Sequence, residues 1–69
     1  MELRALFALN LKRLRVSAGL SQEALADIAG LDRTYISALE RCRYSATLDV
    51  IERLSNALDT DACALLRKE

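Results

Sequence analysis

Histidine, proline and tryptophan are absent from the 69-residue sequence, which also contains only two glycines and two cysteines. Without histidine the chain lacks the commonest general base and the commonest metal ligand, so we expect neither an enzyme nor a metal centre. Cys42 and Cys63 form no C-x-x-C pair, and we therefore predict neither a zinc site nor a redox motif. The absence of a secretory signal favours two free thiols in a cytoplasmic protein over a disulfide.

Long uncharged stretches are also missing, and none approaches the roughly 20 residues of a membrane-spanning helix, so we expect no membrane partner. The chain has no glycine-rich phosphate loop, and we predict no cofactor and no small-molecule ligand. Leucine and alanine are abundant instead, with 14 and 11 residues, and the apolar fraction is 52%. This composition argues against disorder and against a strand-rich fold, and it favours compact helices.

The ten basic and ten acidic residues cancel, so the net charge of zero does not by itself indicate a nucleic-acid partner. The charges are unevenly distributed. Residues 1–46 carry seven basic and five acidic side chains, whereas residues 47–69 carry three and five. Within residues 33–45, three arginines stand against one glutamate. A local basic strip of this kind can bind phosphate groups even in a neutral chain.

Apolar residues at helical spacing predict five helices in a single all-α domain, over residues 3–18, 22–29, 33–41, 48–58 and 62–67. Gly19 and Gly30 follow the first two helices, where a left-handed backbone conformation is favourable. Ser21 and Thr47 are good N-cap residues for the second and fourth helices. We expect Ile28 to point inward and Cys63 to pack in a helix interface as a small hydrophobe.

The second and third predicted helices meet the steric demands of a helix-turn-helix, over residues 22–41. Ala26 is small enough for a close helix crossing, and Gly30 suits a turn that needs a positive φ angle. Ile36 and Leu39 are placed to seat the second helix of the motif against the first. The connection has the three to four residues that this motif uses.

The run from Asn10 to Arg41 resembles the phage-repressor/Cro-like helix-turn-helix family, also called XRE, and the likeness continues through residues 47–61. The segment 31–37 also resembles the controller proteins of restriction–modification systems. The resemblance implies a compact five-helix domain like that of the lambda repressor, covering residues 1–69. The chain departs from the family at Cys42, where glycine is usual, and at Ala46, where proline is frequent, which puts the path of this loop and its phosphate contacts in question.

By resemblance, the helix at residues 33–41 enters the major groove of double-stranded DNA. The implied base-contacting residues are Arg33, Thr34, Tyr35 and Ser37, although Tyr35 is equally well read as a partly buried anchor. The implied phosphate-contacting residues are Ser21, Gln22, Arg41, Arg43, Tyr44 and Ser45. Arg15 and Glu40 are implied to form a semi-buried ion pair between the first and third helices.

One domain of this size contacts only a short half-site, so sequence-specific regulation of transcription predicts a homodimer on a pseudo-palindromic operator. We predict that dimerisation uses residues 48–67, through Ile51, Leu54, Leu58, Leu65 and Leu66. In some phage repressors an acidic patch on the second helix contacts RNA polymerase, and here Glu23 and Asp27 lie on that helix. The alternative function is an antitoxin or adaptor module that retains the fold, but the outward polar set on the predicted DNA-reading helix argues against it.

Overall fold

The computed structural model describes residues 2–68, which form five helices and no strand. The helices are α1 (Leu3–Ser17), α2 (Gln22–Ala29), α3 (Arg33–Glu40), α4 (Leu48–Ala57) and α5 (Ala62–Leu66). Each helix begins at the predicted residue and ends within one residue of the predicted end, which confirms the all-α prediction. No helix in residues 2–68 combines the length and the apolar character that a membrane crossing requires.

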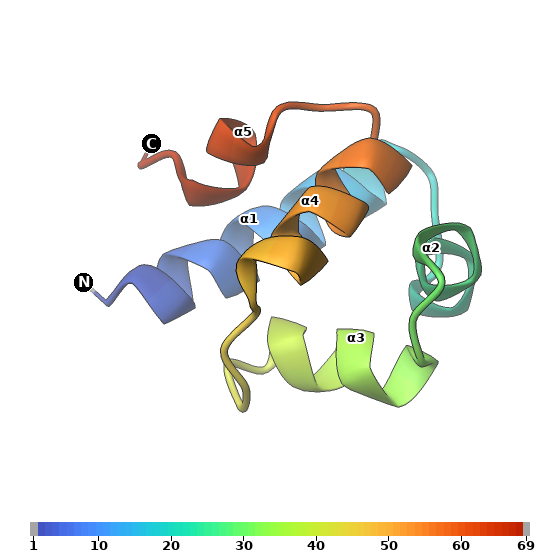
Figure 1. Cartoon of the computed structure of the whole chain (residues 1–69), viewed down its shortest axis with the longest axis horizontal. Coiled ribbons are helices and arrows are strands. Elements are labelled where there is room, and N and C mark those ends of the chain that lie inside the picture. Colours follow the sequence, from blue (N-terminus) through green and yellow to red (C-terminus); the bar gives the residue numbers. More distant parts are fainter. Residues whose placement is uncertain (1, 69) are drawn as a thin grey trace.

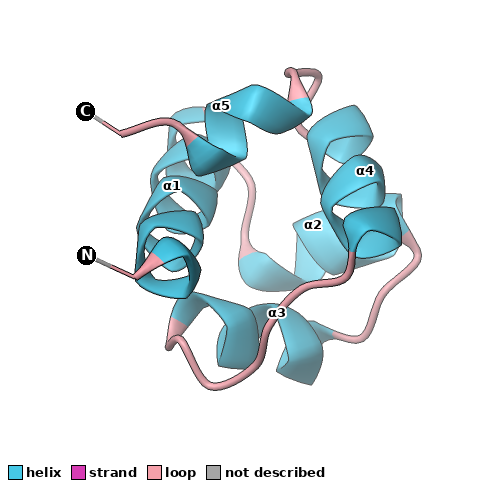
Figure 2. Ribbon diagram, turned by 60° about the vertical axis from the view of Figure 1, so that its left-hand side comes forward, coloured by secondary structure: helices cyan, strands magenta, loops and turns pink. Residues whose placement is uncertain are grey.

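The helices surround a single core (Figures 1 and 2). α2 packs against α3 and α4, and α1 packs against α3 and α5, while α4 and α5 also contact each other. In Figure 1, α3 and the loop that follows it form the lower edge of the molecule, away from α5 at the top. α2 lies at the right-hand side of this view (Figure 1), and no other helix covers the lower side of α3.

The core is built mainly of leucine and isoleucine side chains from all five helices, together with Phe7 and several alanines. Six of these have no exposed surface: Leu11, Leu25, Ile36, Leu39, Leu54 and Leu65. Burying each such side chain contributes about 1.5–3 kcal/mol relative to leaving it in water. Because one or two of these residues come from each helix, the core fixes the position of α3 relative to the other four helices.

Four of the five helices end in the same hydrogen-bonding pattern, in which the backbone passes through a left-handed residue. After α2, the N–H of Leu31 donates to the carbonyl of Ala26 at 2.8 Å, and Gly30 has a φ of 71°. Gly19 takes the same conformation after α1, so both predicted glycine positions are confirmed. After α3 and α4 the left-handed residues are Cys42 and Asp59, with φ of 62° and 54°.

Two predictions about side-chain packing are wrong. Ile28 is 59% exposed, because it lies about 200° around the helix from Ala26, which faces the core. Cys63 is exposed rather than packed in an interface, since it stands at the same angle from the buried Leu65 on α5. Cys42 and Cys63 are both free thiols.

Candidate nucleic-acid interface

The start of α3 is held by Asp32. Its Oδ1 accepts the backbone N–H of Thr34 at 2.8 Å and the Thr34 hydroxyl at 2.7 Å. These hydrogen bonds, the hydroxyl first, lower the pKa of the Asp32 carboxyl below its ordinary value. Because the hydroxyl proton of Thr34 is engaged with Asp32, the methyl group is the part of this side chain that is left for an apolar contact.

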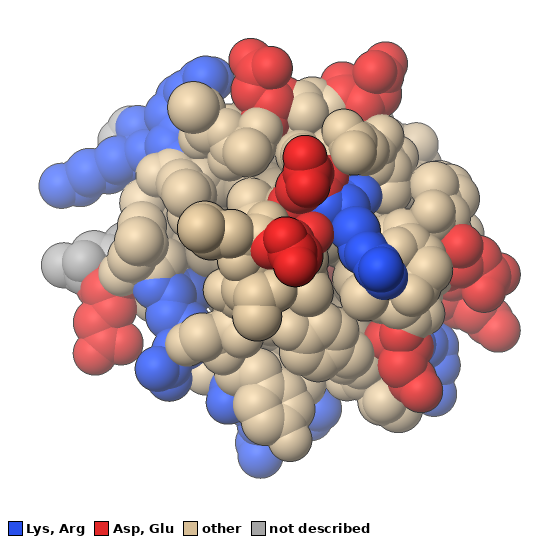
Figure 3. Space-filling model, in the orientation of Figure 1, with Lys and Arg blue, Asp and Glu red and all other residues tan. Residues whose placement is uncertain are grey.

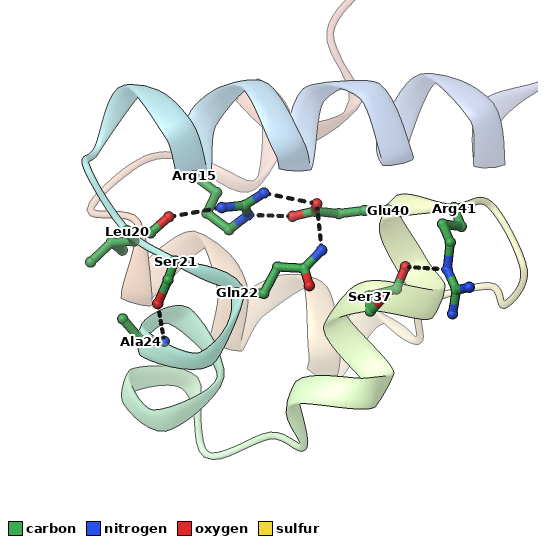
Figure 4. Close-up of polar contacts among 8 residues, drawn as sticks. All are labelled: Arg15, Leu20, Ser21, Gln22, Ala24, Ser37, Glu40 and Arg41. Carbon is green, nitrogen blue, oxygen red and sulfur yellow. Dashed lines mark hydrogen bonds and ion pairs between the residues drawn. The ribbon is translucent and has the colours of Figure 1, made fainter.

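Arg33 and Ser37 lie four residues apart, on one face of α3, as the base-contacting assignment requires. The Arg33 side chain is exposed and forms no side-chain hydrogen bond or salt bridge with residues 2–68, although its charge acts weakly on the neighbouring Asp32. Its guanidinium is therefore available to a ligand. Ser37 is half-buried, and its carbonyl oxygen accepts the Nε–H of Arg41 at 3.3 Å. That bond holds Arg41 along the last turn of α3 (Figure 4).

An open groove of about 630 Å³ runs beside α3 and the loop after it. Its lining is made of two tyrosines, two arginines and two small residues, namely Thr34, Tyr35, Ala38, Arg41, Arg43 and Tyr44. The rings of Tyr35 and Tyr44 are tilted by 40°, with 6.3 Å between their centroids. Tyr35 also packs against the core, so it both anchors α3 and faces this groove. Lysine and arginine side chains gather at the same lower edge in Figure 3.

The turn after α3 keeps the path that glycine would allow, although Cys42 occupies the position. The N–H of Cys42 donates to the Leu39 carbonyl at 3.1 Å, and that of Arg43 donates to Ala38 at 2.9 Å. Arg43 and Tyr44 are exposed just beyond this turn. Ser45 is also exposed but lines a different groove, of about 430 Å³, beside the start of α1, so it does not join the tyrosine groove.

The expected ion pair between Arg15 and Glu40 is present, and it joins α1 to α3 (Figure 4). Arg15 Nε donates to Glu40 Oε2 at 2.6 Å, and Arg15 Nη2 donates to Glu40 Oε1 at 3.1 Å. The side chains are only 12% and 4% exposed. Hydrogen bonding to Glu40 raises the pKa of Arg15 above its ordinary value.

Gln22 and Ser21, both expected to contact phosphates, lie at the start of α2. The Ser21 hydroxyl oxygen accepts the N–H of Ala24 at 3.0 Å and thereby caps the helix. Gln22 Nε2 donates to Glu40 Oε1 at 3.1 Å, which connects it to the ion pair. Sequence reasoning missed this link, because residues 22 and 40 are far apart in the chain and no pattern relates them.

The five residues assigned to the dimer interface differ in burial. Ile51, Leu54 and Leu65 belong to the core of this chain, and the last two have no exposed surface with which to contact a partner. Leu58 and Leu66 are half-buried. In the same region Leu48 is 83% exposed, so the free apolar surface of residues 48–67 is at the start of α4 and on the outer sides of Leu58 and Leu66.

Residues 2–68 contain no group of three or more cysteine, aspartate or glutamate side chains arranged to hold a metal ion. The groups at α3 that can contact a ligand are therefore arginine donors, hydroxyl groups, a threonine methyl group and tyrosine rings. Guanidinium groups suit guanine edges and phosphates, and methyl groups suit thymine.

Comparison with known proteins identifies the helix-turn-helix family that the sequence resembles. Residues 11–65 match the sequence profile of the helix-turn-helix family. A hypothetical transcription factor from Neisseria meningitidis is 49% identical over 65 residues, and the match spans 94% of this chain and 61% of that protein. The crystal structure of the hypothetical transcription factor NHTF from Neisseria superposes with a TM-score of 0.92 at 48% identity, covering 96% of this chain and 76% of that one.

Two similar proteins are named as control or controller proteins, and the second of them as a restriction–modification controller. Control protein C.SmaI from Serratia marcescens is 39% identical over 69 residues, which cover all of this chain and 82% of that protein. The controller protein C.AhdI from Aeromonas hydrophila has a structure with a TM-score of 0.87 and 40% identity, covering 90% of this chain and 94% of that one. The match to C.SmaI takes in all five helices.

Proposed function

Since this chain belongs to the helix-turn-helix family of DNA-binding transcription regulators, we propose that it binds a pseudo-palindromic operator as a homodimer. α3 lies in the major groove of each half-site in this proposal. The likeness to C.SmaI and C.AhdI favours a controller of gene expression of the restriction–modification type. The observation that carries the proposal is that the exposed Arg33 and the arginine–tyrosine groove lie at the same edge of the domain.

The proposed contacts with base edges come from four residues of α3, namely Arg33, Thr34, Ser37 and Tyr35. The guanidinium of Arg33 extends from the first turn of α3, which is the part of a recognition helix that meets base edges. A bidentate contact from this group to guanine contributes to sequence preference, and the methyl of Thr34 suits a thymine. Tyr35 is half-buried and presents part of its ring beside them.

The residues proposed to contact phosphates, on either side of the base contacts, lie at the start of α2 and in the turn after α3. Ser21 and Gln22 lie where the backbone N–H groups of a helix start attract an anion. Arg41 and Arg43 line the groove together with Tyr44, and Ser45 follows in the same loop. Phosphate contacts from both sides fix the register of α3 on the duplex.

Dimerisation is proposed through residues 48–67. Among the leucines of this region, Leu48 is exposed and Leu58 and Leu66 are half-buried, whereas the others are in the core. Two copies on one face of the duplex place their recognition helices about 34 Å apart, one turn of DNA. Glu23 and Asp27 remain exposed on α2, and we propose them as the surface that would face RNA polymerase.

The proposal is tested by selecting binding sites from random duplex DNA with the purified chain. We expect an enriched sequence with two inverted half-sites about one helical turn apart, and a dimer in sedimentation on and off DNA. Leu48→Ser, at an exposed position, is expected to weaken dimer formation while circular dichroism shows that the chain is still folded at the assay temperature. Failure to enrich any sequence would contradict operator binding and would leave the antitoxin or adaptor reading in its place.

A further inference from the structure

We infer that the Arg15–Glu40 ion pair orients Gln22 for its contact with a DNA phosphate, beyond holding α1 to α3. This inference rests on the proposed function, because it concerns the same interface. Arg15 and Glu40 are positioning residues in it, since neither side chain has the exposed surface to be a main contact. Gln22 is the residue that would touch DNA.

The geometry that supports it is a shared acceptor. Glu40 Oε1 accepts Arg15 Nη2 and Gln22 Nε2, both at 3.1 Å. Arg15 Nη1 also donates to the carbonyl oxygen of Leu20 at 2.8 Å, two residues before Gln22. One arginine on α1 therefore fixes the backbone that enters α2 and, through Glu40, the side chain at the first residue of α2 (Figure 4).

An amide nitrogen carries two protons, and Glu40 takes only one of those on Gln22 Nε2. The other proton is then held in a defined direction, available to a phosphate oxygen. A glutamine loses much rotamer freedom when it is ordered by a ligand, and a glutamine that is ordered in advance loses less. Loss of the orienting bond is therefore expected to weaken binding about three- to tenfold per half-site.

Electrostatics alone predicts the opposite sign. Glu40 carries a negative charge at an interface proposed to meet phosphates, so its removal should strengthen DNA binding if charge were its only influence. The variant Glu40→Gln removes the charge while keeping the size of the side chain. Weaker DNA binding by this variant would thus indicate that Gln22 is no longer oriented. Stronger DNA binding would indicate that the charge of Glu40 acts mainly by repelling phosphates.

A double-mutant cycle separates positioning from stability. Operator affinity is measured for the wild-type chain, Glu40→Gln, Gln22→Ala and the double variant, at temperatures where thermal melts show all four to be folded. We expect Gln22→Ala to weaken binding, and Glu40→Gln to weaken it only when Gln22 is present. The melting temperature should fall with Glu40→Gln in both backgrounds, because the loss of the ion pair does not depend on Gln22.

The matched control is Glu23→Gln, which removes a neighbouring negative charge from the exposed face of α2. It should strengthen binding slightly. Equal weakening by Glu40→Gln in both backgrounds, strengthening like that of Glu23→Gln, or an inert Gln22→Ala would each overturn the inference while leaving operator binding in place. A wild-type chain that binds no operator would contradict the proposed function as well.

A measurement on the free wild-type chain does not depend on the folding of any variant. The side-chain amide of Gln22 should show NMR order parameters near those of rigid backbone, about 0.85, before DNA is added. The amide of the exposed Asn56 on α4 provides the mobile reference. An order parameter for Gln22 below about 0.6 would mean that Glu40 does not orient it, and would overturn the inference.

Discussion

Asn10 on α1 donates its side-chain Nδ2 to the carbonyl oxygen of Leu65 on α5 at 3.0 Å, across 55 positions of sequence. The same nitrogen donates to the carbonyl of Arg67 at 2.9 Å, and Asn10 Oδ1 accepts Arg13 Nη2 at 2.8 Å. Asn10 has no exposed surface. One buried amide therefore satisfies the carbonyl groups at the end of a five-residue helix that is too short to be stable alone.

Replacing Asn10 by alanine should destabilise the fold by about 2–3 kcal/mol, because two carbonyl groups lose their partner and a small cavity forms. Asn10→Asp should be at least as harmful, since it places an acceptor against two acceptors. The free energy of unfolding is measured by urea denaturation. The control is Asn56→Ala on the exposed side of α4. A loss no larger than that of the control would show that α5 does not depend on this bond.

The second prediction concerns Cys42, a non-glycine residue with a φ of 62° at the end of α3. The left-handed conformation costs a residue with a Cβ roughly 1–2 kcal/mol, of which glycine's greater entropy in the unfolded chain offsets a part. Cys42→Gly should therefore stabilise the protein by about 1 kcal/mol. Cys42→Ala, which removes the thiol and keeps the strain, is the control and should be nearly neutral. Equal melting temperatures of the two variants would contradict the argument.

The acidity of Asp32 leads to a prediction about pH. The pKa of its carboxyl is lowered in the folded chain, first by the hydrogen bond from the Thr34 hydroxyl and then by that from the Thr34 N–H. A lowered folded-state pKa means that this cap contributes full stability above the ordinary aspartate value. The contribution is lost as pH falls through the lowered pKa.

Asp32→Asn should therefore differ most from the wild type in melting temperature near pH 7, with the difference shrinking as pH falls below about 4. Thermal unfolding from pH 7 to pH 3 measures this. Asp61→Asn is the matched control, because Asp61 precedes α5 at the same position but accepts no capping hydrogen bond. A difference between wild type and Asp32→Asn that stays constant over the whole range would contradict the assigned role.

The sequence was sufficient for the helices because their ends carry local signals. Gly19, Gly30, Ser21 and Thr47 act on neighbouring backbone groups, so position in the chain is enough to recognise them. The sequence did not predict the left-handed residues Cys42 and Asp59. Cysteine gives no signal for that conformation, and aspartate gives a weaker one than glycine. Backbone hydrogen bonds to the preceding turn of α3 and of α4 accompany the left-handed conformation at both residues.

In the candidate site, too, local relationships could be predicted from the sequence and contacts between distant segments could not. Arg33, Thr34 and Ser37 share a face because helical spacing requires it, and that followed from residue numbers alone. The bond from Gln22 to Glu40 and that from Asn10 to Leu65 join segments 18 and 55 positions apart, which only a three-dimensional arrangement reveals. Asn10 did carry a signal, since it stands three residues after Phe7 and four before Leu14, on the apolar stripe of α1.

The last prediction separates base reading from phosphate binding at the two ends of α3. Arg33 stands at the first residue of the helix, where a forked side chain can reach a guanine edge. Arg43 stands beyond the turn at Cys42, in the groove shared with Tyr44, where a phosphate is the nearer target. Arg33→Ala should then cost about 1–3 kcal/mol of binding free energy per half-site and flatten the preference at one base pair.

Arg43→Ala should instead weaken operator and random DNA alike, and reduce the slope of log affinity against log salt by roughly one per subunit. Both variants are titrated on the selected operator, on its single-base variants and on random DNA, at several salt concentrations. Lys68→Ala, beyond α5 and outside residues 48–67, is the control for a simple loss of charge and should change little. The two roles would be reversed if Arg33→Ala weakened every DNA equally while Arg43→Ala changed the preferred base. If neither affected any DNA, α3 would not be the DNA-reading helix.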